Sequence, residues 1–167
     1  MGENQSNIVL IGMPGVGKST VGVLLAKATG RGFVDTDVLI QVGQGRSLQE
    51  ILDADGSEPF LRIEEDYLCC LGAIGSVIAK GGSAVYSAKA MANLQAGGVI
   101  VYLHLPLDVL ARRIEDLYVR GVVMARGQTL ASLYGQRRQL YEKYANMTIE
   151  CEGLTQDQVV GEILKRM

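Results

Sequence analysis

The residues with the most definite chemistry are a lysine and a serine that close a glycine-rich stretch near the N-terminus. Residues 12–20 read Gly-Met-Pro-Gly-Val-Gly-Lys-Ser-Thr, which fits the pattern G-x-x-x-x-G-K-[ST] without a gap. Glycines let backbone N–H groups approach phosphate oxygens, and a helix that begins near Gly17 points its partly positive end at them. Lys18 is then placed to reach β- and γ-phosphates, and the Ser19 hydroxyl to ligate Mg²⁺. We predict nucleotide binding through Gly12, Gly15, Val16, Gly17, Lys18, Ser19 and Thr20.

Two carboxylates, Asp35 and Asp37, follow the second apolar run of the chain. One carboxylate in such a place can hold Mg²⁺ through water, and the other can accept a proton from an attacking hydroxyl. Aspartate also favours solvated turns where it caps a helix, so the pair has a structural explanation as well. The loop 80–83, Lys-Gly-Gly-Ser, follows the third apolar run and is another candidate for ligand contacts.

Short apolar runs alternate with helical patterns along the whole chain. Strands are predicted at 7–11, 32–35, 76–79, 99–103 and 147–150. The helices between and after them include one that Ser47 and Glu50 cap together and one that Ser57 caps. This alternation favours a parallel sheet covered on both faces, and ligands of such sheets gather beyond the carboxyl ends of the strands. Residues 117–127 lack a clean period and are typical of a mobile flap.

Bulk properties exclude several classes of protein. The chain has 167 residues, 48% of them hydrophobic, and a net charge of −2, so we expect one domain and no nucleic-acid partner. Three cysteines, two of them adjacent and none in a C-x-x-C pattern, indicate reduced thiols. The polar N-terminus and the lack of an 18-residue apolar run favour a cytoplasmic protein that does not enter membranes. We expect a monomer.

Several further motifs recur in the order and spacing of one enzyme family. They are Asp35-Thr36-Asp37, Phe60 with Arg62-Ile63-Glu64, Gly81-Gly82, Arg120 and Arg137-x-x-Leu140-Tyr141. Over nearly the whole chain the sequence resembles the shikimate kinase family. The resemblance implies an α/β, three-layer P-loop NTPase fold with a five-stranded parallel sheet, helices on both faces and a nucleoside-monophosphate-kinase-like core. It also implies an acceptor-binding segment at about 36–63, a lid at about 117–127, and transfer of the γ-phosphoryl of ATP, with Mg²⁺, to a hydroxyl of shikimate.

The same resemblance implies roles for individual residues. The implied catalytic residues are Lys18, Asp37 and Arg120, with Asp37 as the base. The implied acceptor contacts are Asp37, Gly81, Gly82 and Arg137. Asp35 would join Ser19 at the Mg²⁺, and Arg113 would lie beside adenine. For each arginine the alternative is a surface charge with no partner.

The acceptor side departs from the family pattern. The family motif reads Phe-Arg-x-x-Glu and its arginine binds the shikimate carboxylate, but Leu61 stands at that position. Arg62 is no simple substitute, because one helical step rotates a side chain by about 100°. The third glycine of the family's Gly-Gly-Gly is Ser83, and Lys80 precedes the pair. Either Lys80 or Arg62 is a candidate for a relocated cation.

These departures leave several functions open. The first is a kinase that phosphorylates shikimate, and its variant is the same chemistry on another acceptor such as homoserine or a sugar acid. The second is an ATP-binding module without catalysis. The third is a nucleoside monophosphate kinase or another P-loop phosphotransferase.

Overall fold

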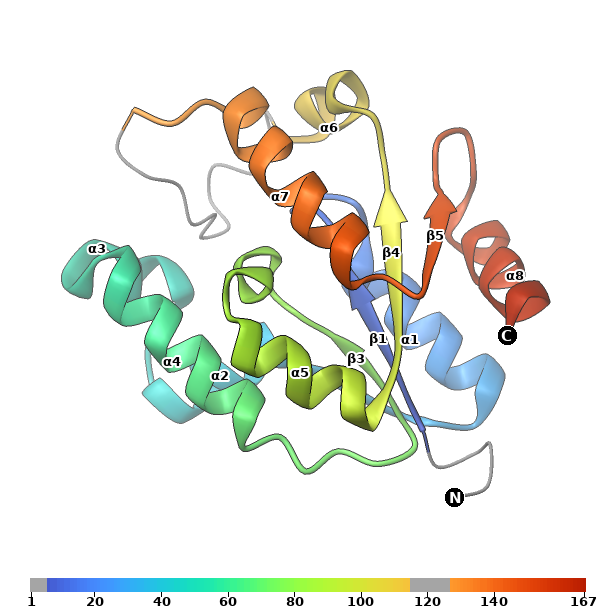
Figure 1. The fold of residues 1–167 in the computed structure, drawn as a ribbon, viewed down its shortest axis with the longest axis horizontal. Coiled ribbons are helices and arrows are strands. Elements are labelled where there is room, and N and C mark those ends of the chain that lie inside the picture. The colour runs from blue at the N-terminus through green and yellow to red at the C-terminus, as the bar shows by residue number, and fades with distance from the viewer. Residues whose placement is uncertain (1–5, 115–126) are drawn as a thin grey trace.

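Five parallel strands form a single sheet, in the order β2-β3-β1-β4-β5 (Figure 1). The computed structural model describes residues 6–114 and 127–167. The strands are β1 (Asn7–Ile11), β2 (Gly32–Asp35), β3 (Ser76–Ala79), β4 (Gly98–His104) and β5 (Met147–Glu150). The predicted five-stranded parallel sheet is therefore confirmed.

The register brings the carboxyl ends of three strands to one edge of the sheet. Ala79 at the end of β3 pairs with Leu10 of β1 on one side and with Asp35 of β2 on the other. At this edge the glycine-rich loop follows β1, Asp37 lies just after the end of β2, and Lys80 is the first residue after β3. The three stretches that sequence reasoning selected thus start next to one another.

Helices cover both faces of the sheet, so β1 and β3 are buried along their whole length and are apolar after their first residues, Asn7 and Ser76. On one face lie α1 (Lys18–Thr29) and α8 (Gln156–Arg166) (Figure 1). On the other lie α4 (Ser57–Cys69), α5 (Ala88–Gly97) and α7 (Leu130–Tyr144). The sheet and these helices enclose the main hydrophobic core of the protein.

The chain between β2 and β3 carries a small core of its own. It contains α2 (Thr36–Gln44) and α3 (Leu48–Asp55) before α4. Its buried members come from all three helices and are Ile40, Leu48, Ile51 and Phe60. This separate packing lets the segment 36–63 stand as a wall beside the edge of the sheet.

Some local predictions are confirmed and others are wrong. The capping box of Ser47 and Glu50 is present at the start of α3. Ser57 does not cap α4: Gly56 holds the cap position, and no side chain there bonds the helix. The 3₁₀ helix η2 (Gly82–Tyr86) and the start of α2 directly after Asp35 were not predicted. Helix α6 (Leu107–Ile114) follows Pro106 as expected. Residues 117–126 of the predicted lid, with Arg120, lie outside the described residues.

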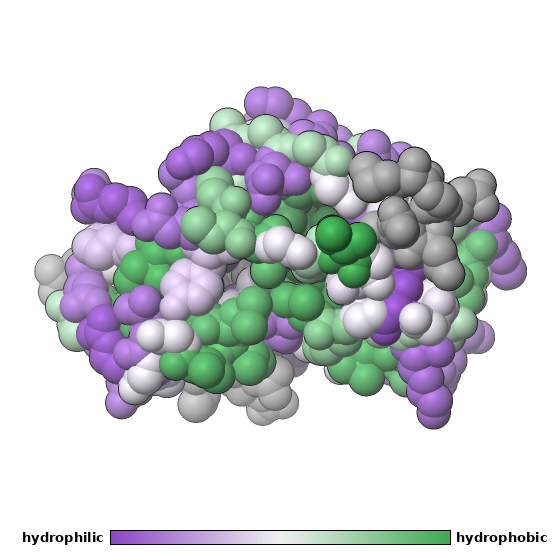
Figure 2. Space-filling model, turned by 90° about the horizontal axis from the view of Figure 1, so that it is seen from below, coloured by the Kyte–Doolittle hydropathy of each residue, from purple (hydrophilic) through white to green (hydrophobic). Residues whose placement is uncertain are grey.

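The described surface is mixed in character. Figure 2 shows apolar and polar residues side by side on the face seen from below, and large apolar side chains such as Val42 and Ile74 are exposed. None of the described helices has the length and apolar character needed to cross a bilayer. All three cysteines are free thiols.

Candidate active site

The glycine-rich loop joins β1 to α1 and directs the start of that helix into a cavity. Gly17 occupies the cap position in the left-handed conformation, with φ of 101°, so the first N–H groups of α1 are left without a side-chain cap. Gly15, Gly17 and Thr20 line the cavity. Val16 is buried in the main core, so its contribution to a ligand is limited to its backbone.

Lys18 bends back over the loop. Its Nζ donates to the backbone oxygens of Gly12, at 2.9 Å, and Met13, at 3.0 Å. Burial lowers the pKa of Lys18 to about 8, and the neighbouring Asp37 carboxylate partly opposes this shift. The side chain therefore holds its ammonium over the loop, where an anionic ligand can bind it.

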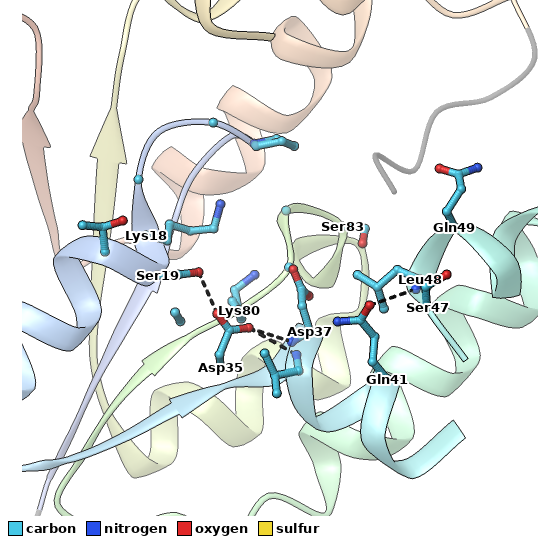
Figure 3. A pocket seen from close by; sticks show the side chains of 18 of the residues that line it. Lys18, Ser19, Asp35, Asp37, Gln41, Ser47, Leu48, Gln49, Lys80 and Ser83 are labelled. Atoms are coloured by element: carbon cyan, nitrogen blue, oxygen red, sulfur yellow. Dashed lines mark hydrogen bonds between the residues drawn. The ribbon is translucent and has the colours of Figure 1, made fainter. Parts of the chain in front are cut away.

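Ser19 and Asp35 form a pair on adjacent elements. The Ser19 hydroxyl donates to Asp35 Oδ2 at 2.6 Å (Figure 3). The other oxygen, Oδ1, accepts from the N–H groups of Asp37 and Val38 and so caps α2. Both explanations of Asp35 hold together: it caps a helix and still presents an oxygen beside Ser19. Hydroxyl and carboxylate oxygens are ligands that suit Mg²⁺, which keeps several waters and needs few protein groups. The described residues contain no cluster of three or more acidic, histidine or cysteine side chains arranged for a metal.

Asp37 differs from Asp35 because one of its oxygens has no protein partner. Its Oδ1 is buried and makes no hydrogen bond with any described residue. Burial raises the pKa of Asp37, while the nearby Lys18 ammonium opposes the rise. A buried carboxylate oxygen left unpaired at the rim of a cavity is available to a ligand hydroxyl.

The glycines at 81 and 82 permit a close approach of charged side chains. A Cβ on Gly81 would lie under 3.0 Å from both Glu64 Oε1 and Asp37 Oδ1. A Cβ on Gly82 would lie 2.7 Å from Arg137 Nη1. Two carboxylates and a guanidinium therefore crowd against a stretch of backbone that only glycine leaves open.

Arg137 is buried although it carries a charge. It projects from α7, is 1% exposed, and donates from Nε to the Tyr86 hydroxyl at 3.3 Å. Its guanidinium also lies 5.4 Å from the centre of the Tyr86 ring. The Tyr141 hydroxyl, one turn along α7, donates to Gly82 O at 2.9 Å and ties the helix to the loop. Arg137 is thus fixed beside the cavity rather than free on the surface.

Arg113 and Leu61 complete the account of the predicted residues. Arg113 is exposed at the end of α6, and its Nη1 donates to Gly15 O at 3.5 Å, so it lies over the glycine-rich loop. Leu61 is half-buried on α4. The described residue that α4 contributes to the cavity wall is its neighbour, Phe60.

Sequence reasoning gave no role to Glu64 and named Lys80 only as one of two candidates for a relocated cation, yet the structure buries both charges beside the cavity. Each is 1% exposed. Ser83 donates to Glu64 Oε2 at 2.7 Å, while Glu64 Oε1 and Lys80 Nζ have no hydrogen-bond partner among the described residues. Burial raises the pKa of Glu64 and lowers that of Lys80 to about 7. The signal in the sequence that could have indicated the burial of Lys80 is its position directly after the apolar run of β3.

One cavity of about 510 Å³ lies at the carboxyl edge of the sheet, and its lining includes Lys18, Asp37 and Lys80 but neither Glu64 nor Arg113. Figure 3 shows Lys18, Asp37 and Lys80 directed into it from three different elements. Gln41, Ser47, Leu48 and Gln49 of the small helical segment form the opposite wall. The cavity is large enough for a phosphate chain and a small second molecule, with cations and carboxylates interleaved where the two would meet.

Comparisons with known proteins agree with one another. The family model for shikimate kinase matches residues 14–167. A shikimate kinase of Mycobacterium bovis (strain BCG / Pasteur 1173P2) is 39% identical over 162 residues, which cover 95% of this chain and 92% of that protein. The structure of shikimate kinase from Acinetobacter baumannii in complex with shikimate is similar with a TM-score of 0.90 at 31% identity, over 98% of this chain and 93% of the other. Shikimate kinase from Aquifex aeolicus gives a TM-score of 0.77 at 28% identity, over 95% and 94% of the two chains.

Proposed function

The chain belongs to the shikimate kinase family, and from that premise we propose that it transfers the γ-phosphoryl group of ATP to a hydroxyl group of shikimate. The relatives are small-molecule kinases that match nearly its full length. The observation that carries the proposal within the site is the buried, unpartnered Oδ1 of Asp37, which shares its cavity with the Lys18 ammonium.

Lys18 and the start of α1 bind the phosphate chain of ATP. When phosphate arrives, the Lys18 ammonium exchanges its contacts with Gly12 O and Met13 O for phosphate oxygens, and the N–H groups at the start of α1 donate to the same anion. Ser19 and Asp35 would hold Mg²⁺, and the ion would supply positive charge to neutralise the phosphates. Arg113 contacts the adenine of ATP, and its hydrogen bond to Gly15 O, which keeps it beside the glycine-rich loop, supports this role.

Asp37 orients the acceptor hydroxyl and accepts its proton. Phosphoryl transfer depends mainly on positioning and on charge stabilisation, so one well-placed carboxylate and several cations suffice. Gly81, Gly82 and Arg137 bind the acceptor, and the guanidinium of Arg137 is the group suited to its carboxylate. The segment 36–63 forms the acceptor wall. The lid at about 117–127 and the role of Arg120 remain implied by the family resemblance, because Arg120 lies outside the described residues.

The other functions have less support. The comparisons do not favour a different acceptor, such as homoserine or a sugar acid, which Leu61 had suggested. An ATP-binding module without catalysis would have no need for a buried unpaired aspartate opposite the phosphate-binding lysine. Nucleoside monophosphate kinases would need a site for a base, and the family match does not support one.

A direct assay tests the proposal. The purified protein is incubated with ATP, Mg²⁺ and shikimate, and both ADP release and the phosphorylated product are measured, with homoserine, gluconate and AMP as alternative acceptors. Shikimate should give the highest kcat/KM.

The substitution Asp37→Asn should lower kcat by a factor of about 10² to 10⁴, the usual range for a general base. The control Asp66→Asn changes an exposed aspartate of α4 and should leave turnover unchanged. Preference for another acceptor would refute the assigned substrate, and full turnover in Asp37→Asn would refute the assigned base.

A further inference from the structure

Lys80 lies at the end of β3, the strand between β1, which leads into the phosphate-binding loop, and β2, which leads to Asp37. It is the first residue after β3, and β3 pairs with β1 on one side and with β2 on the other. The chain after β1 forms the loop with Lys18, and the chain after β2 carries Asp37. A side chain that enters the cavity from the end of β3 therefore reaches the space between the phosphate-binding loop and the acceptor-binding aspartate (Figure 3).

The ammonium of Lys80 lacks a partner in the protein. The residue is 1% exposed and lines the cavity, and its Nζ makes no hydrogen bond with any described residue. The charges that act on it come from four elements: Glu64 on α4, Lys18 on α1, Arg137 on α7 and Asp37 on α2. Two of these are cations, so the surroundings do not neutralise Lys80 well. A buried charge without a hydrogen-bonding partner is costly, and such groups are usually satisfied by a ligand or a partner.

Glu64 does not satisfy this need. Glu64 accepts a hydrogen bond from Ser83 through Oε2, while its Oε1 is also buried without a partner. Because neither Glu64 Oε1 nor Lys80 Nζ has a hydrogen-bond partner among the described residues, these two atoms are not joined in a direct ion pair. Burial lowers the pKa of Lys80 to about 7, and an anion brought next to Nζ would favour the charged form.

We propose that Lys80 is a further substrate-binding cation of this kinase, which holds an anionic oxygen at the point where the phosphoryl group passes from ATP to the acceptor. The inference rests on the proposed function and assigns a specific contact within it. The anionic oxygen has two possible sources, the γ-phosphoryl group of ATP and the carboxylate of the acceptor. Both are anions that an ammonium binds with charge-assisted hydrogen bonds.

Calorimetric binding to three ligands separates the two sources. The variant is Lys80→Met, which keeps the length of the side chain and removes the charge, and Lys80→Gln is the second variant in case the first does not fold. The control, Lys89→Met, makes the same change on an exposed position of α5. The ligands are a non-hydrolysable ATP analogue, ADP and shikimate, each with Mg²⁺.

Contact with the γ-phosphoryl group predicts that the variant binds the ATP analogue about tenfold or more weakly while its affinity for ADP is unchanged. Contact with the acceptor carboxylate predicts a loss of the same size for shikimate, with both nucleotides unaffected. Either pattern supports the proposal. Affinities within twofold of wild type for all three ligands would overturn it, whatever happens to the melting temperature, because a lysine that only balances Glu64 would alter stability alone. Failure of the wild-type protein to phosphorylate shikimate would instead refute the proposed function, and the nucleotide measurements would still test Lys80.

Discussion

The substitution Gly81→Ala adds only one methyl group, but we expect it to displace Asp37 and to lower catalytic activity strongly. The Cβ of Gly81→Ala would lie under 3.0 Å from Glu64 Oε1 and from Asp37 Oδ1, closer than real Cβ atoms approach such neighbours. Both oxygens belong to buried side chains, and neither has a hydrogen bond that fixes it. The carboxylates must therefore move apart, and Asp37 leaves the position from which it would accept the proton of the acceptor.

The magnitude follows from overpacking and from positioning. Forcing extra atoms into a packed site costs about 1–3 kcal/mol, and the atoms in the way are side-chain ends rather than backbone, so we expect about 1–2 kcal/mol of lost stability. A displacement of about 1 Å in a catalytic group can cost about 10²-fold in rate, so kcat/KM for the acceptor should fall by about that factor. The binding of ATP should change little, because the atoms nearest the added Cβ belong to Glu64 and Asp37 and not to the glycine-rich loop.

The matched control is Gly135→Ala. Gly135 lies exposed in α7, and nothing lies within 4 Å of the position its Cβ would take. The same chemical change there should stabilise the protein by about 0.5–1 kcal/mol, because alanine loses less backbone entropy in a helix than glycine does. Urea unfolding measures both free-energy changes, and steady-state kinetics measures kcat/KM. If Gly81→Ala unfolds at the wild-type urea concentration with wild-type kinetics, the crowding of Glu64 and Asp37 against Gly81 is wrong.

Two further predictions concern the metal and the pH. Ser19→Ala removes a hydroxyl that lies 2.6 Å from Asp35, so the Mg²⁺ concentration that gives half-maximal rate should rise several-fold, whereas nucleotide affinity measured without Mg²⁺ should stay the same; an unchanged Mg²⁺ requirement would remove Ser19 from the metal site. Burial raises the pKa of Asp37 above its ordinary value of 3.8, and Asp37 accepts a proton only when ionised, so kcat/KM for the acceptor should fall as the pH is lowered through this raised pKa. A pH–rate profile whose acidic limb lies at the ordinary aspartate pKa would contradict the assignment.

Much of the fold could be predicted because its signals are local. The strands were placed by short runs of Ile, Val and Leu, and the sheet buries β1 and β3 on both faces. Ser47 and Glu50 predicted the start of α3 because a capping box needs only four consecutive residues. The prediction that Ser57 caps α4 is wrong for a physical reason. Gly56 takes the cap position with a φ of 85°, which a glycine adopts at little cost, and a glycine has no side chain that could bond the first N–H groups of the helix.

Buried charges were harder to predict from the sequence. Lys80 follows an apolar strand, which is a weak local signal of burial, but Glu64 stands between Ile63 and Glu65, and no local pattern indicates that its side chain is 1% exposed. Their burial follows from the packing of α4 and α7 against the loop after β3, which is a tertiary event. Leu61 shows the opposite case: it departs clearly from the family motif, yet its side chain is half-buried outside the cavity lining, and its neighbour Phe60 lines the cavity.

The two halves of the site differ in predictability because they are built differently. The phosphate-binding half uses backbone N–H groups of one continuous loop, so a pattern of glycines within nine residues is enough to specify it. The acceptor half uses side chains from α2, α4, α7 and the loop after β3, and their meeting depends on how these elements pack. A single substitution there, such as lysine at position 80, changes the charge of the cavity without altering the fold. Differences in acceptor recognition within this architecture should therefore arise at such side-chain positions, while the glycine-rich loop keeps its form.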